Sequence, residues 1–145
     1  MTTPSHTHFL RVRYSEVDAL GTYYNSRVLE WFECGRTELC RALGRPYTEW
    51  ERDGIGLPLI TAHVQYSGKA RYDDLLEVKT TASLAGRARL RFDMEIVLAA
   101  SGQKVCSGYT VHAITDLSGR PTRPPAWLLK MLESPDCPPG RDCLE

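Results

Sequence analysis

The chain has 145 residues, 42% of them apolar, which is typical of one domain with a continuous core. Its 18 basic and 18 acidic side chains give a net charge of zero, which excludes a globally basic surface for nucleic acid or an anionic membrane. No apolar run reaches transmembrane length, and residues 1–8 lack the features of a secretory signal. We therefore expect one cytoplasmic domain over residues 1–145, with its core at about 8–133 and a poorly ordered tail at 134–145.

The cysteines predict neither disulfides nor a metal site. They form no C-x-x-C pair, and with His63 and His112 they offer no two ligands at zinc-finger spacing. We expect reduced thiols, no bound metal, and histidines whose ring nitrogens are satisfied within strands. The five thiols are those of Cys34, Cys40, Cys106, Cys137 and Cys143.

The first half of the chain predicts one strand and two helices. Residues 9–14 alternate like a strand, whereas apolar side chains recur at intervals of three and four over residues 26–43, which predicts a long, largely buried helix. Gly35 in its middle costs about 1 kcal/mol relative to alanine, which is most easily explained if the helix approaches a sheet closely there. Gly44 follows in the position favoured for a left-handed cap, and residues 45–53 predict a short second helix.

Four segments with strand periodicity make up most of the second half. They are joined by short turns, which favours antiparallel pairing because parallel neighbours need long crossovers. A short amphipathic helix at 126–132 follows three prolines. The element order predicts an α+β fold, with a curved antiparallel five-stranded sheet packed around a long central helix. The four segments are residues 60–67, 75–84, 88–98 and 104–115.

The loop before the long helix carries the candidate chemistry. Asp18 lies close to a helix start, where free N–H groups and the helix dipole can stabilise an oxyanion. A carboxylate beside such a site suggests acyl-transfer hydrolysis. An aspartate in this position can also simply accept hydrogen bonds from loop amides, and Asn25 or Ser26 can simply cap the helix.

These residues resemble a known family. The run D-A-L-G-T-Y-Y-N at 18–25, with residues 13–18 before it and 29–36 after it, resembles the hotdog-fold acyl-CoA thioesterases, particularly the 4-hydroxybenzoyl-CoA thioesterase-like branch. The resemblance spans about residues 9–115 and includes residues 70–78. It implies a hotdog fold and hydrolysis of an acyl-CoA thioester to coenzyme A and a carboxylic acid. It further implies no cofactor and a homodimer or homotetramer with active sites at subunit contacts.

The resemblance also implies roles for individual residues. The catalytic carboxylate falls on Asp18, as general base or nucleophile, the tight-turn glycine on Gly21, and the oxyanion donor on the backbone N–H near Asn25. Relatives often carry histidine or tyrosine where this chain has Asn25, although a backbone donor survives a change of side chain. Tyr23 and Tyr24 either line the acyl pocket or fill the gap between the loop and the sheet.

Coenzyme A carries phosphate charges, so a neutral protein that binds it needs a local cationic surface. Arg87 and Arg89 share one strand face and are expected to contact phosphate, although a solvated or salt-bridged sheet face explains them equally well. Lys69 and Arg71 lie near another strand end. Glu33 is expected to pair with Arg36 or another nearby cation rather than to act as a second acid.

Three other functions remain open at the level of sequence. The chain can act on acyl carrier protein instead of coenzyme A, or it can be a noncatalytic module that binds acyl thioesters. A hotdog dehydratase or hydratase generally uses a histidine with a carboxylate, and the motif around Asp18 contains no histidine.

Overall fold

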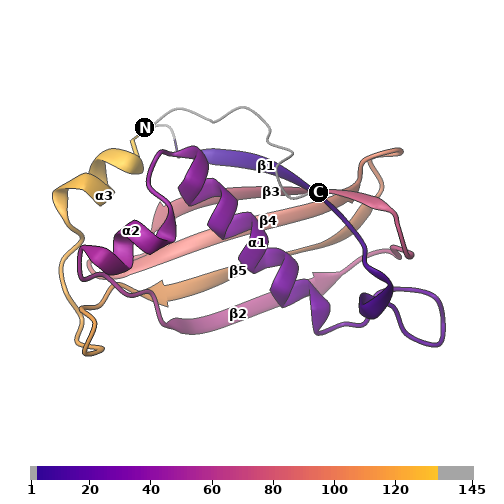
Figure 1. Ribbon diagram of the computed structural model, residues 1–145, viewed down its shortest axis with the longest axis horizontal. Helices are drawn as coiled ribbons and strands as arrows, with labels where there is room; N and C mark the ends of the chain where they lie inside the picture. Colours follow the sequence, from indigo (N-terminus) through magenta and orange to yellow (C-terminus); the bar gives the residue numbers. More distant parts are fainter. Residues whose placement is uncertain (1–2, 134–145) are drawn as a thin grey trace.

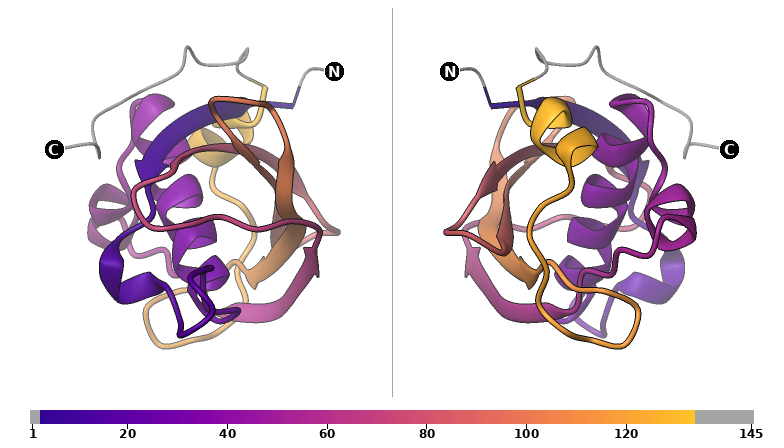
Figure 2. Two further views of the ribbon diagram at one scale, coloured as in Figure 1. Left: turned by 90° about the vertical axis from the view of Figure 1, so that its right-hand side faces the viewer. Right: turned by 90° about the vertical axis from the view of Figure 1, so that its left-hand side faces the viewer.

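The computed structural model describes residues 3–133, so the expected poor order of residues 134–145 lies outside the described part. The five strands form one antiparallel sheet in the order β1-β3-β4-β5-β2. Helix α1 lies across one face of this sheet (Figure 1), and the end views show the sheet curving around it (Figure 2). This is the hotdog architecture expected from the sequence. The elements are β1 Ser5–Arg11, the 3-10 turn η1 Tyr14–Glu16, α1 Arg27–Ala42, α2 Tyr47–Arg52, β2 Leu59–Tyr66, β3 Leu75–Leu84, β4 Arg89–Leu98, β5 Lys104–Ala113 and α3 Ala126–Met131.

The core forms where the apolar stripe of α1 meets the inward-facing residues of β3 and β4. Phe32 and Leu39 of the helix are fully buried, and so are Leu76, Val78 and Ile96 of the strands. Helical and strand periodicities therefore converge on one interface, as the sequence predicts. Among residues 3–133, no helix is long and apolar enough to cross a membrane.

Helix α1 approaches the sheet most closely at Gly35. A Cβ atom at this position would lie 2.4 Å from Thr80 Oγ1 and 2.9 Å from Val78 Cγ1, both on β3. Real side chains do not make such contacts, so only glycine allows the helix to lie this near the strand. The predicted reason for a glycine inside a helix is confirmed.

Strand β1 differs from its prediction, because it spans Ser5–Arg11 rather than residues 9–14. His6 and His8 are buried and pair with Thr80 and Val78 of β3. These polar residues hide the alternation on which the prediction relied. The ladder ends after Arg11, and residues 14–16 turn into the 3-10 helix instead.

Strand β2 lies at one edge of the sheet. It pairs with β5 on one side only, and all of its residues except Val64 are exposed. Such an edge presents unpaired backbone groups and is a template for a further strand. The sequence pattern predicts the strand, but it does not predict that the strand is an edge.

We predict that Gly35→Ala destabilises the fold. Overpacking costs about 1–3 kcal/mol, which exceeds the roughly 1 kcal/mol of helix propensity that alanine gains. Urea denaturation of Gly35→Ala in the parent and in a Thr80→Ala background measures the effect. The penalty should be smaller without the Thr80 hydroxyl, and an equal penalty in both backgrounds would contradict the clash.

Candidate active site

Asp18 lies at the tip of a short hairpin that leads into α1. The Tyr24 N–H donates to the Glu16 carbonyl at 2.8 Å, and the Asp18 N–H donates to the Thr22 carbonyl at 2.9 Å. Gly21 adopts a positive φ of 80° in the tight turn, and its N–H donates to the Asp18 carbonyl. The Asp18 carboxylate accepts the Leu20 N–H at 2.8 Å through one oxygen, so the loop fixes its orientation and leaves it half-buried.

The start of α1 offers free amides beside this hairpin. Within residues 3–133, the N–H groups of Asn25 and Ser26 donate no hydrogen bond to protein, and Ser26 forms no side-chain cap. Asp18 pairs with Thr22 and lies two residue pairs along the hairpin from the pair formed by Glu16 and Tyr24. This separation corresponds to roughly 7 Å along the strand. Asn25 and Ser26 follow Tyr24 directly in the sequence, so the hairpin and the two amides belong to one region of the chain. Within the described residues, neither the Asn25 nor the Ser26 side chain accepts a capping hydrogen bond from the first turn of α1.

Glu16 anchors the base of the hairpin, which sequence reasoning missed. The residue is only 2% exposed, and its carboxylate accepts hydrogen bonds from the Arg13 backbone N–H at 2.7 Å and the Trp31 indole N–H at 3.0 Å. The Arg13 guanidinium adds a third contact at 3.3 Å. Because buried carboxylates need such partners, Glu16 ties the loop directly to helix α1.

The two neighbouring tyrosines have different environments. Tyr23 is 5% exposed, and its hydroxyl donates to the Gly68 carbonyl at 3.1 Å, so it fills the space between the loop and the sheet. Burial raises the pKa of Tyr23 to about 12, which keeps it protonated. Tyr24 is 56% exposed beside the helix start, where it remains a candidate contact for substrate.

The predicted phosphate-binding arginines lie far from Asp18 within one chain. Arg87 and Arg89 are exposed near the end of β3 that is remote from the hairpin, and the ten residues of β3 correspond to roughly 30 Å. Arg71 is much nearer, because its guanidinium lies 3.7 Å from the position of a Cβ on Gly21. The structure therefore joins Asp18, Gly21 and Asn25 in one region, with Arg71 beside them, and separates Arg87 and Arg89 from it.

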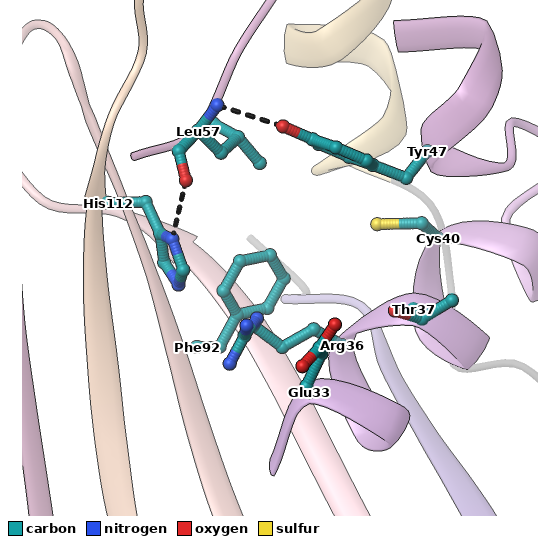
Figure 3. A pocket seen from close by; sticks show the side chains of 8 residues that line it. All are labelled: Glu33, Arg36, Thr37, Cys40, Tyr47, Leu57, Phe92 and His112. Atoms are coloured by element: carbon teal, nitrogen blue, oxygen red, sulfur yellow. Dashed lines mark hydrogen bonds between the residues drawn. The ribbon is translucent and has the colours of Figure 1, made fainter. Parts of the chain in front are cut away.

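A cavity of about 150 Å³ lies beside α1, lined by both polar and apolar side chains (Figure 3). Helix α1 contributes four of the lining side chains, and the others come from α2, the α2–β2 connection, β4 and β5. Asp18 is not among them. The lining residues are Glu33, Arg36, Thr37, Cys40, Tyr47, Leu57, Phe92 and His112.

Arg36 enters this cavity without the expected ion pair. It is half-buried, and burial lowers the pKa of its guanidinium, while Glu33 opposes that shift only through a longer-range attraction. No ion pair joins Glu33 to a cation in the part of the chain that the structure describes. The exposed Glu33 carboxylate therefore attracts Arg36 electrostatically, but within residues 3–133 it does not form a close ion pair.

His112 has both ring nitrogens engaged, as predicted. Nδ1 contacts the Leu57 carbonyl oxygen and Nε2 contacts the Thr110 hydroxyl, each at 3.0 Å. Burial lowers the pKa of His112, and the nearby Arg36 guanidinium lowers it further, whereas the Leu57 carbonyl raises it. The residue therefore supports the cavity wall as a neutral imidazole.

Comparison with known proteins identifies related chains. The family model of the thioesterase-like superfamily matches residues 12–132. YneP of Bacillus subtilis is 34% identical over 71 residues, which cover 49% of this chain and 51% of that protein. The acyl-CoA thioesterase YbgC of Haemophilus influenzae is 34% identical over 89 residues, which cover 61% of this chain and 65% of that protein. The matches thus span about half to two thirds of these two relatives.

A solved structure extends the likeness over nearly the whole chain. The crystal structure of a hypothetical protein from Aquifex aeolicus, AQ1494, superimposes with a TM-score of 0.81 and 26% sequence identity. The superposition covers 87% of this chain and 98% of that one.

We predict that Glu16→Gln lowers the free energy of unfolding by about 1–3 kcal/mol. The substitution places an amide NH₂ donor among N–H donors that need an acceptor. Denaturant unfolding measures the change. Glu30→Gln, on the exposed surface of α1, is the control and should shift stability by less than about 0.5 kcal/mol. Equal effects would argue against an anchoring role for Glu16.

His112 makes stability depend on pH. In the unfolded chain His112 has its ordinary pKa of about 6.5, whereas in the folded chain its pKa is lower. The unfolded chain therefore binds a proton at higher pH than the folded chain does. As a result, the free energy of unfolding falls as the pH is lowered through the pKa of the unfolded chain. Unfolding free energies between about pH 7.5 and 5.5 should fall less steeply for His112→Gln than for the parent. His63→Gln, which replaces a histidine at an exposed site, is the matched control. Three equal slopes would disprove the assignment.

Proposed function

Because this chain belongs to the thioesterase-like superfamily, we propose that it hydrolyses an acyl-CoA thioester to coenzyme A and a carboxylic acid. The observation that supports the proposal is the half-buried Asp18 carboxylate, which its loop orients in the hairpin that leads into α1, together with the Asn25 and Ser26 N–H groups, which donate no hydrogen bond to protein within residues 3–133. The activity named for the Haemophilus relative supports the same reaction.

In the proposed reaction the thioester carbonyl oxygen lies against the N–H groups of Asn25 and Ser26. Asp18 removes a proton from water as water attacks the carbonyl carbon, or it attacks that carbon itself to form a mixed anhydride that water then hydrolyses. The amides stabilise the resulting oxyanion. Its collapse breaks the carbon–sulfur bond, and the thiolate leaves and takes up a proton. Water is the only co-reactant, and no metal or redox cofactor is used.

We further propose that the active protein is a homodimer formed through β2, alone or within a homotetramer. The exposed edge of β2 can pair with the same edge of a second copy, which satisfies its free backbone groups. A dyad through the middle of the strand makes this pairing antiparallel. The Tyr66 end of one strand then faces the Leu59 end of the other.

This pairing explains why the candidate binding groups lie at opposite ends of the sheet within one subunit. The strand registers place Arg89, Ala113 and the start of β2 at the same end of the sheet, and the cavity residue Leu57 also lies there. In the proposed dimer, Arg87 and Arg89 of the partner subunit approach the hairpin of Asp18 and can contact the phosphates of coenzyme A. The partner's cavity lies near the acyl group.

We predict that Asp18→Asn lowers kcat by about 10²–10⁴-fold, because it removes the base or nucleophile. Asparagine keeps a side-chain oxygen that can accept the Leu20 N–H, so the loop should remain in place. Asp116→Asn alters an aspartate in a comparable turn, where Oδ1 accepts the Ser118 N–H, and should leave kcat unchanged. Release of free thiol from acetyl-, hexanoyl-, benzoyl- and 4-hydroxybenzoyl-CoA measures the effect.

The same assay separates the remaining functions. Faster hydrolysis of an acyl carrier protein thioester than of the matched acyl-CoA would indicate that the acyl carrier protein thioester, and not acyl-CoA, is the substrate. Tight binding of acyl-CoA without thiol release above background would indicate a noncatalytic module. Full turnover by Asp18→Asn on every substrate that the parent hydrolyses would overturn the proposed mechanism.

A further inference from the structure

The last residue of β2 reaches the start of helix α1. The Tyr66 hydroxyl donates a hydrogen bond to the Asn25 carbonyl oxygen at 2.9 Å, across 41 positions of the sequence. The Val28 N–H also approaches this oxygen, but at 3.4 Å the contact is long for a hydrogen bond. Tyr66 therefore makes the shorter of the two contacts that orient this carbonyl.

The Asn25 carbonyl belongs to the same peptide unit as the Ser26 N–H. A trans peptide is planar, so its C=O and N–H point in opposite directions and fixing one fixes the other. A hydrogen bond accepted by the carbonyl also polarises the peptide and strengthens its N–H as a donor. Ser26 N–H is one of the two amides at the helix start that make no hydrogen bond to protein within residues 3–133.

Packing determines where the Tyr66 hydroxyl lies. Its ring stacks on the buried ring of Tyr23, with centroids 6.3 Å apart and an interplanar angle of 27°. Tyr23 in turn contacts Trp31 at 5.2 Å, and the Trp31 indole N–H donates to Glu16. The row of three rings thus connects the sheet edge to the base of the Asp18 hairpin and limits movement of the hydroxyl.

From this arrangement we propose that Tyr66 is a positioning residue for the oxyanion site, an inference that rests on the proposed thioesterase function. The hydroxyl holds the Asn25–Ser26 peptide so that the Ser26 N–H points at the developing oxyanion. Because Tyr66 lies on the edge strand that forms the proposed dimer, the geometry of this donor depends on β2. Tyr66 is 43% exposed in one chain, and pairing of β2 would shield its hydrogen bond from water.

The test compares Tyr66→Phe with Tyr72→Phe, each measured in the full chain. Tyr66→Phe keeps the ring and removes only the hydroxyl, whereas Tyr72 is an exposed tyrosine whose ring contacts Tyr14. We expect kcat for thiol release to fall about tenfold in Tyr66→Phe with KM within about twofold, a fraction of the 10²–10³-fold loss on removing an oxyanion donor. Tyr72→Phe should retain the parent values.

A spectroscopic measurement separates donor positioning from loss of stability. Infrared difference spectra of benzoyl-CoA labelled with ¹³C at the thioester carbonyl, bound to Asp18→Asn, should show a carbonyl band at lower frequency than in water. The added Tyr66→Phe change should move that band back towards the value in water.

The outcomes distinguish this inference from the function on which it rests. An unchanged kcat in Tyr66→Phe, a change in KM alone, or an unchanged carbonyl band would overturn the positioning role and leave the thioesterase proposal intact. Absence of turnover by the parent on every acyl-CoA and acyl carrier protein thioester would overturn both.

Discussion

The contact between Gly35 of α1 and Thr80 of β3 is the constraint on which the rest of the structure depends. With no side chain between helix and strand at this point, the helix lies deep in the concave face of the sheet, and Phe32 and Leu39 fill the core on either side. The sheet curves around a helix that it contacts so closely (Figure 2). The start of α1 is thereby fixed beside the end of β2, where Tyr66 meets Asn25.

The candidate site is assembled from groups that hold one another in place. Glu16 ties the hairpin to Trp31, and the hairpin in turn orients the Asp18 carboxylate through the Leu20 N–H. The free amides require no side chain of their own, because they are the unpaired N–H groups that every helix start provides. The proposed stabilisation of an oxyanion requires preorganised donors, and the rigid support of the hairpin and the Asn25 and Ser26 amides, which lack acceptors within residues 3–133, fits that requirement.

The sequence predicts the architecture well, because helical and strand periodicities are strong over α1, β3 and β4. Gly35, in the middle of a helix, also indicates a close approach of that helix to the sheet. The start of β1 was misplaced because buried His6 and His8 do not look like core residues. Tyr66 and Glu16 were missed for another reason. Their roles depend on partners 41 and 15 positions away, and single-sequence patterns carry no information about such pairs.

The thiols of the three cysteines within residues 3–133 differ from free thiols in their reactivity towards disulfides. Burial raises the pKa of Cys40 and Cys106 to about 12, and burial also raises the pKa of Cys34, so all three are protonated at neutral pH. Disulfide exchange requires a thiolate as the attacking group. Cys34, Cys40 and Cys106 are therefore poor nucleophiles towards small disulfides at neutral pH.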